Sequence, residues 1–160
     1  MNQNYTHREV STSDLEAICK FPLNETELFF MFPKAEFPLT VAQLRSSVDS
    51  RCDSTVILFE NKVIGFANFY EVVKDQYCTI GNLIVNREFR GKGAGDFLIK
   101  TMEKLAVANH MAKEIHLSCF NQNIAGLLLY HRSGYVPYHI EKRLDKNGVN
   151  IASIKLKKTL

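Results

Sequence analysis

Residues 80–102 read IGNLIVNREFRGKGAGDFLIKTM, and three segments of different character follow one another within them. An apolar, β-branched run ends at Val85, as is typical of a strand. Three glycines then fall within the five residues from Gly91 to Gly95. From Ala94 onward, apolar residues recur at steps of three and four, which places them on one face of a helix. The pattern predicts a strand, a glycine-rich turn and a helix.

The predicted turn is suited to bind an anion. Glycine permits unusual backbone conformations and removes side chains that would block a close ligand. The turn opens onto a helix N-terminus, where unpaired N–H groups and the positive end of the helix dipole favour negative charge. Arg87, Arg90 and Lys92 add positive charge nearby. We therefore expect a phosphate-bearing ligand that is held mainly by main-chain amides.

Two common phosphate-binding motifs do not fit this turn, and a third pattern does. A P-loop requires Gly-Lys-Ser/Thr at its end, and a dinucleotide-binding fingerprint requires a third glycine three residues after the second. Asp96 occupies the decisive position in both comparisons. The remaining pattern, Arg90-x-x-Gly93-x-Gly95, resembles the acetyl-CoA pyrophosphate loop of the GNAT N-acetyltransferase superfamily. An ordinary glycine-rich turn between a strand and a helix is the alternative.

Length and composition bound the class of protein. With 160 residues the chain can bury a substantial core, so we expect a single domain over residues 1–160. Hydrophobic residues make up 46% and charged residues 23%, and the net charge of +3 calls for no nucleic-acid or membrane partner. The N-terminus lacks the apolar core of a signal peptide. Four scattered cysteines, without a Cys-x-x-Cys pair, indicate a reducing compartment and no metal site. We therefore expect a cytoplasmic protein.

The remaining chain alternates between strand and helix patterns. Three runs between residues 55 and 85 are joined by short turns and predict an antiparallel meander. The strand at 113–119 is reached through the central helix, so we expect it to run parallel to the strand that ends at Val85. A hairpin at 135–156 closes the chain. We expect an α/β (α+β) fold with a mixed, mostly antiparallel sheet of about seven strands, flanked by about four helices.

Residues 123–135 form a second signature. Asn123 is followed by a small residue three positions on, by Tyr130 four positions further, and then by Gly134-Tyr135. This spacing is similar to a GNAT pattern, and so is the order of the predicted strands and helices. Two independent motifs on the expected elements identify residues 55–156 as similar to a GNAT enzyme.

The resemblance implies a fold and a set of cofactor contacts. In the GNAT acyl-CoA N-acyltransferase fold a parallel strand pair splays apart at the cofactor cleft, here after Leu83–Val85 and Cys119. A pantetheine arm can satisfy the unpaired main-chain groups of such a wedge, much as an added strand would. The implied contacts with acetyl-CoA come from the main chain of Leu83, Ile84 and Val85 for the thioester, from the amides of Arg90, Gly91, Lys92, Gly93, Ala94, Gly95 and Asp96 for the pyrophosphate, and from Asn123 beside the pantetheine arm.

The resemblance assigns acid chemistry to Tyr130 and leaves the general base open. The Tyr130 hydroxyl is implied to lie near the thioester sulfur, where it can protonate the leaving thiolate. The alternative is a core tyrosine with a capped hydroxyl. Thr79 stands where some GNAT enzymes carry a glutamate. Glu71 could act as the base directly or through a water, or could be a solvated charge at a strand end. A water chain is another route, and the weaker candidates are Glu25, Glu27 and His116.

The resemblance also implies the reaction. We expect acetyl transfer from acetyl-CoA to a primary amine, of a small molecule or a peptide, by direct attack in a ternary complex. The alternative is a non-catalytic acyl-CoA-binding sensor or interaction module on the same fold. The aromatic segment from Phe29 to Phe37 is either a cover for the core, as a loop or short helix, or a substrate lid. Exposed edge strands in the closing hairpin leave room for a homodimer.

Overall fold

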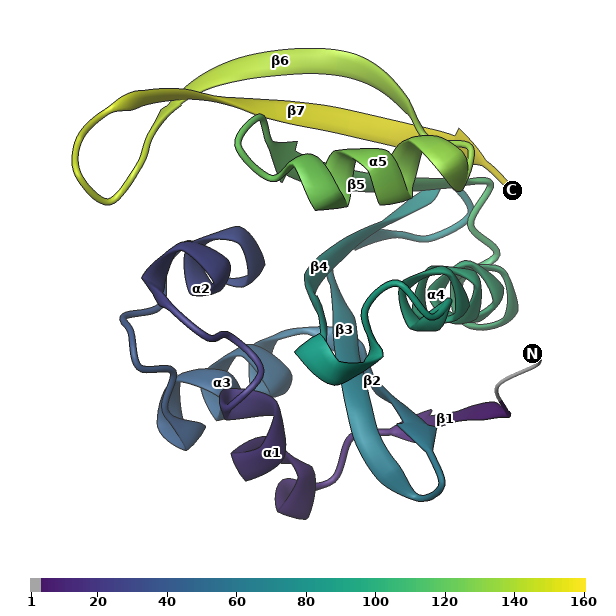
Figure 1. The fold of residues 1–160 in the computed structure, drawn as a ribbon. Coiled ribbons are helices and arrows are strands. Elements are labelled where there is room, and N and C mark those ends of the chain that lie inside the picture. Colours follow the sequence, from purple (N-terminus) through teal and green to yellow (C-terminus); the bar gives the residue numbers. More distant parts are fainter. Residues whose placement is uncertain (1–3) are drawn as a thin grey trace.

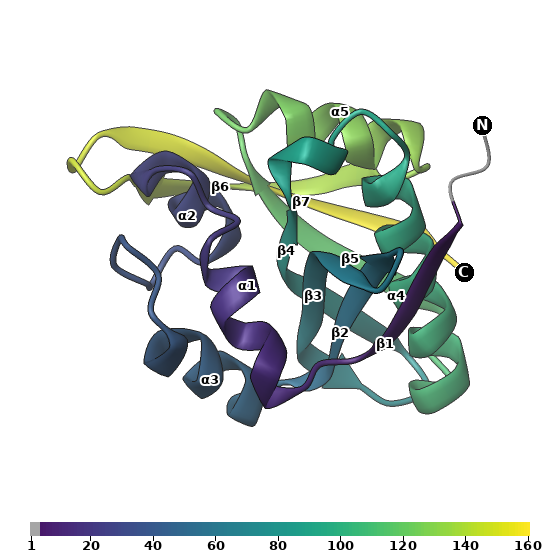
Figure 2. The same ribbon diagram turned by 60° about the horizontal axis from the view of Figure 1, so that its bottom comes forward.

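A seven-stranded sheet forms the centre of the molecule, and helices cover both of its faces (Figures 1 and 2). The structure is a computed structural model and describes residues 4–160. Neighbouring strands follow the order β1-β2-β3-β4-β5-β7-β6, and β4 and β5 run parallel while the other pairs are antiparallel. The expected mixed, mostly antiparallel sheet is confirmed. The strands are β1 (Tyr5–Glu9), β2 (Cys52–Phe59), β3 (Lys62–Val73), β4 (Tyr77–Val85), β5 (Glu114–Phe120), β6 (Val136–Leu144) and β7 (Asn150–Thr159).

Five α-helices lie within the described residues, one more than the sequence predicted. The additional helix is α2, which forms in the aromatic region. Asn24 caps this helix, because its side-chain oxygen accepts a hydrogen bond from the Glu27 N–H. Phe29 of α2 stacks on Phe120 of β5 with ring centroids 4.5 Å apart, so α2 covers the sheet. No helix in residues 4–160 is both long and apolar enough to cross a membrane. The helices are α1 (Leu15–Cys19), α2 (Glu25–Met31), α3 (Val41–Ser50), α4 (Ala94–His110) and α5 (Ile124–Arg132).

Each face of the sheet carries its own apolar core. On one face, side chains such as Phe69 of β3 pack with Met102 of α4 and Tyr130 of α5. On the other face, side chains such as Phe66 of β3 pack with Leu44 of α3. Because neighbouring residues of a strand point to opposite faces, a register slip in β3 would expose both cores. The central strands are therefore fixed in register.

The strands β4 and β5 pair over a short distance and then diverge. The resemblance placed the divergence after Leu83–Val85 and Cys119, and this was wrong, because pairing already stops at Thr79 and His116. A bulge in β4 accounts for the early divergence. Asn82 has a φ of +50°, and the β3–β4 register shifts beside it. A bulge bends a strand and increases its twist, which carries β4 away from its neighbour. The paired residues are Tyr77 with Glu114, Cys78 with Ile115 and Thr79 with His116.

A buried polar network holds the bulge in place. The Asn82 side-chain oxygen accepts hydrogen bonds from the Ser47 hydroxyl, from Asn68 Nδ2 at 3.0 Å and from Arg51 Nη1 at 2.9 Å. Its Nδ2 donates to the Met31 carbonyl at 3.1 Å, which ties the bulge to α2. Asn68 and Asn82 are almost fully buried. The bulge conformation therefore depends on Asn82, which joins the sheet to Ser47 of α3, to the α3 C-cap Arg51 and to Met31 of α2.

Replacing Asn82 by alanine should destabilise the protein. The substitution leaves buried donors without an acceptor, at about 1–3 kcal/mol, and places an alanine in the left-handed region, at about 1 kcal/mol more. Urea unfolding of the purified protein measures the loss. The matched control is Asn147→Ala in the exposed β6–β7 turn, for which we expect a change within about 0.5 kcal/mol. Equal effects of the two substitutions would contradict the role of the network.

Candidate active site

The divergence of β4 and β5 creates a wedge of unpaired main chain. Beyond Thr79, the edge of β4 that faces β5 has no strand partner within residues 4–160. Leu83, Ile84 and Val85 lie in this part of β4, which pairs with β3 but not with β5, and the Val85 carbonyl accepts a hydrogen bond from Arg90. Cys119 lies opposite on β5. Buried main-chain N–H and C=O groups are nearly always hydrogen-bonded in native proteins. A ligand with alternating donors and acceptors could satisfy the groups along this edge.

The glycine-rich turn presents a row of free amides at the start of α4. Gly91 and Gly93 have φ values of +71° and +86°, and Gly93 is the N-cap of the helix. The N–H groups from Gly91 to Asp96 donate to no acceptor in the described part of the chain, and the first helical hydrogen bond comes from Phe97. This arrangement has the donors and the dipole orientation that an anion prefers.

The three glycines of the turn serve two purposes. A Cβ atom added to Gly91 or Gly93 would meet nothing within 4 Å, so these positions require glycine for their backbone conformation. A Cβ on Gly95 would lie 3.1 Å from the Leu129 side chain, so this position serves the close approach of α4 to α5. A salt bridge of 3.2 Å between Asp96 and Arg132 joins the same two helices.

Arg90 contributes less free charge than the sequence suggested. Its guanidinium forms two hydrogen bonds with the Glu27 carboxylate, at 2.7 and 3.1 Å, and its Nε donates to the Val85 carbonyl at 2.9 Å. These contacts tie the turn to α2 and to the end of β4. The hydrogen bonds from Arg90 also hold the pKa of Glu27 below its ordinary value, despite partial burial. Glu27 is thus a structural partner of Arg90, and its lowered pKa makes it a weak general base.

Asn123 begins helix α5. Its side-chain oxygen accepts a hydrogen bond from the Gly126 N–H at 3.0 Å, as an N-cap residue does. A Cβ on Gly126 would lie 2.6 Å from Asn123 Nδ2, so a larger residue three positions after the asparagine would displace the capping side chain. The spacing within the second signature therefore reflects helix capping, and the cap places Asn123 directly after the wedge strand β5.

Tyr130 combines burial with an uncommitted hydroxyl. The residue is 7% exposed, yet its hydroxyl forms no hydrogen bond within residues 4–160. Burial raises the pKa of Tyr130, with a further contribution from nearby Cys119. The phenol is therefore protonated at neutral pH and has a proton to donate. By contrast, the Tyr135 hydroxyl donates to Glu103 at 3.0 Å.

Glu71 lies where the two strands begin to separate. The Thr79 hydroxyl donates to Glu71 Oε2 at 3.3 Å, and Thr79 is the last β4 residue paired with β5. His116, the β5 residue that pairs with Thr79, stacks on Tyr77 with ring centroids 4.3 Å apart, and its Nε2 lies 2.7 Å from Glu114 Oε2. Of the candidate bases, Glu71 is the carboxylate beside the wedge that has no basic partner in the described residues. Because the Glu71 side chain is exposed, a solvated charge at the strand end stays the alternative to a general base.

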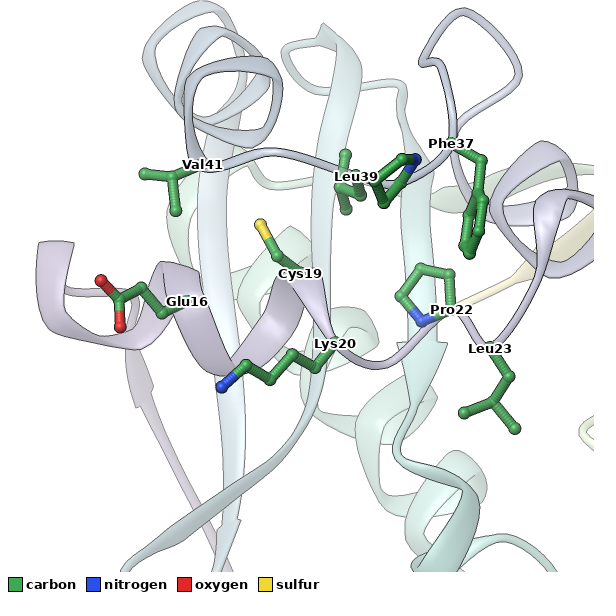
Figure 3. Close-up of a pocket in the computed structure, with 9 residues that line it drawn as sticks. Glu16, Cys19, Lys20, Pro22, Leu23, Phe37, Leu39 and Val41 are labelled. Carbon is green, nitrogen blue, oxygen red and sulfur yellow. The ribbon is translucent and has the colours of Figure 1, made fainter.

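A separate pocket of about 530 Å³ lies between α1 and the segment that leads into α3 (Figure 3). Its lining comes from α1, from the connection to α2 and from the segment before α3, including Cys19, Leu23 and Phe37. Nothing from β4, β5 or α4 contributes to it. The pocket is therefore distinct from the wedge. In residues 4–160, no group of three or more His, Cys, Asp or Glu side chains could hold a metal ion.

The splayed parallel strands, with a glycine-rich turn at the helix that follows, define the acetyltransferase class of fold. The model of the Acetyltransferase (GNAT) family matches residues 16–135. The chain belongs to the GNAT acetyltransferase family.

Known relatives agree with this assignment. The spermine/spermidine N(1)-acetyltransferase of Bacillus subtilis (strain 168) is 26% identical over 101 residues, which cover 59% of this chain. The match spans 64% of that relative's length. A spermidine N-acetyltransferase from Vibrio cholerae, solved with CoA and spermine, shares the fold with a TM-score of 0.82 at 19% identity, over 99% of this chain and 96% of the other. A putative phosphinothricin N-acetyltransferase shares it with a TM-score of 0.79 at 20% identity, over 98% and 99%.

The polar network behind the bulge was not found from the sequence. Its members come from α3, its C-cap, β3 and β4, and side chains so far apart in the chain show no common motif. One local signal was present, because Gly81-Asn82 interrupts an apolar strand and both residue types favour a bulge.

Replacing Glu27 by glutamine should weaken the link between α2 and the turn. Because the folded-state pKa of Glu27 is lowered, its contribution is complete above the ordinary value and is lost as the pH falls through the lowered pKa. For this partly exposed pair we expect roughly 0.5–1 kcal/mol at neutral pH, shrinking below about pH 4. Urea unfolding across this pH range measures the difference from the wild type.

Glu25→Gln is the matched control, since Glu25 lies in the same helix without an ion-pair partner in the described residues. It should change stability little at any pH. A Glu27→Gln effect that persists undiminished in acid would show that the ion pair is not its cause.

Proposed function

We propose that the protein transfers the acetyl group of acetyl-CoA to a primary amine by direct attack in a ternary complex. The observation that carries the proposal is the row of free amides from Gly91 to Asp96, next to the unpaired edge of β4. An anionic diphosphate fits the amides of the turn, and an amide-bearing arm fits the unpaired edge of β4. Family membership supports the same reading.

The cofactor contacts follow from these positions. We assign the pyrophosphate to the main-chain amides of Arg90, Gly91, Lys92, Gly93, Ala94, Gly95 and Asp96. The pantetheine arm lies along Leu83–Val85 with Asn123 beside it, and a main-chain N–H of that edge polarises the thioester carbonyl. When bound, acetyl-CoA supplies an activated acyl group with a thiolate as its leaving group.

The protein's own residues handle the protons. The neutral amine forms a bond to the thioester carbon, and the bond from that carbon to sulfur breaks. Tyr130 gives its proton to the departing thiolate, which is consistent with its protonated, uncommitted hydroxyl. Glu71 takes the proton that the amine loses, through Thr79 or a water, and a water chain to solvent restores Tyr130. Because the amine attacks the thioester directly, no acyl-enzyme forms and no cysteine nucleophile is required.

The acceptor, assembly and location complete the proposal. Because two relatives are named for spermine or spermidine, both amines belong in the panel of acceptors to be tested. For a homodimer, β6 offers the pairing surface, because it is the edge strand of the sheet and is exposed along most of its length. The four free cysteines fit a cytoplasmic location.

Thiol release from acetyl-CoA in the presence of an amine panel tests the proposed activity. We expect release that depends on both substrates, and mass spectrometry should find the amine acetylated. Thermal shift with CoA should exceed that with ATP or NAD, because a ligand that binds the folded state stabilises it. CoA binding without thiol release for any amine would favour the acyl-CoA-binding module instead.

Replacing Tyr130 by phenylalanine should lower kcat roughly 10²-fold or more and leave CoA affinity unchanged. Stability should change by less than about 0.5 kcal/mol, because the hydroxyl has no partner to lose. Steady-state kinetics and calorimetry give the two values. Tyr135→Phe is the control, since its hydroxyl is bound to Glu103 and should not affect kcat. Parallel losses of kcat and CoA affinity would argue against an acid role.

A further inference from the structure

Arg51, which follows α3, carries a charge without a counterion. No carboxylate in residues 4–160 lies within ion-pair distance of its guanidinium. Its side chain is partly buried, and this burial lowers the pKa of Arg51. A partly buried charge without a partner is costly to a protein. Four other arginines have carboxylate partners within 3.2 Å: Arg8 with Asp14, Arg90 with Glu27, Arg132 with Asp96 and Arg143 with Glu141.

The folded chain uses one edge of this guanidinium and leaves the other free. Nη1 donates to the side-chain oxygens of Asn68 and Asn82, at 3.1 and 2.9 Å. Nη2 and Nε donate to no acceptor in the part of the chain that the structure describes. The rings of Phe32 and Tyr70 lie 5.7 and 5.4 Å from Cζ. Aromatic rings stabilise a guanidinium without using its N–H groups, so a fork of donors remains for a planar anion.

The free fork lies beside the start of the wedge, on the face opposite α4. A Cβ on Gly81 would be 2.6 Å from Arg51 Nη1 and 2.7 Å from a Tyr70 ring carbon, so Arg51 touches β4 here. Gly81 is two residues beyond Thr79, which corresponds to roughly 7 Å along a strand. Tyr70 is 48% exposed, so solvent reaches this part of the sheet.

The negatively charged Glu71 lies on the same face of the sheet as Arg51. The β3 register shifts between Phe69 and Glu71, and Glu71 accepts a hydrogen bond from Thr79. A carboxylate and a guanidinium therefore flank the start of the wedge. An ammonium group would pair with Glu71, and a carboxylate with the free edge of Arg51.

We propose that the acceptor is an amine that also carries a carboxylate, as amino acids do, and that Arg51 binds this carboxylate through Nη2 and Nε. The inference rests on the proposed function, because it names the substrate class of the same site. Arg51 acts away from the reacting atoms and determines specificity. A purely cationic acceptor would leave Arg51 without a counterion and would meet its repulsion.

The first test uses the wild-type protein and matched pairs of amines. Each of a set of α-amino acids is compared with its own C-terminal amide in the thiol-release assay. The amine of the amide is less basic and so more often neutral, which by itself would favour the amide. We expect kcat/KM values about 10- to 100-fold higher for the free acids than for their amides. This ratio corresponds to the free energy of one hydrogen-bonded pair of charged groups.

Variants locate the effect at Arg51. Arg51→Gln should abolish the preference for the acid over the amide while calorimetry shows CoA affinity retained, and Arg51→Lys should keep part of it. Arg45→Gln, an exposed arginine in α3, should keep all of it. The wild-type comparison stands even if the Arg51 variants fold poorly.

The outcomes separate the two proposals. Acetylation of amides or of spermine at rates equal to or above those of the free acids would overturn this inference and leave the acetyltransferase function standing. A preference for acids that Arg51→Gln retains would also overturn it. No thiol release with any amine would overturn the proposed function and this inference together.

Discussion

The break in hydrogen bonding between β4 and β5 determines how this molecule can work. The two strands share three residue pairs and then separate, although both continue for several residues. A sheet does not leave main-chain groups unpaired without another partner for them. The bulge at Asn82 and the helix α2 keep the strands from closing the gap. The wedge is therefore fixed by the packing of the core, and its free main-chain groups are available to a ligand.

The proposed anion site consists of main-chain amides, so the charged side chains around it are not needed as ligands. The amides from Gly91 to Asp96 are free, while Arg90 and Asp96 form ion pairs that fix the turn to α2 and to α5. A site made of backbone donors keeps its geometry as long as the helix and its N-cap persist. The side chains around it mainly hold the turn in position.

Much of the fold could be predicted from the sequence, because its signals are local. The glycine-rich turn and the Asn123 cap are encoded within a few residues, and the strands around them follow from short apolar runs. Helix α2 was harder to predict, since three prolines and an aromatic cluster surround a short segment whose cap is a single asparagine, Asn24. Proximity across the sheet could not be predicted. The pairing of Arg90 with Glu27, and the meeting of Arg51 with Asn82, depend on tertiary packing that no spacing in the chain reveals.

The central claim is that the unpaired edge of β4 and the amides of the turn together form a cradle for coenzyme A. Titration of ¹⁵N-labelled protein with CoA, followed by amide chemical shifts, tests it most directly. The largest shifts should fall on Gly91–Asp96 and on Leu83–Val85, with saturation at one CoA per chain. Absence of binding, or shifts confined to the pocket beside Cys19 and Phe37, would contradict the account.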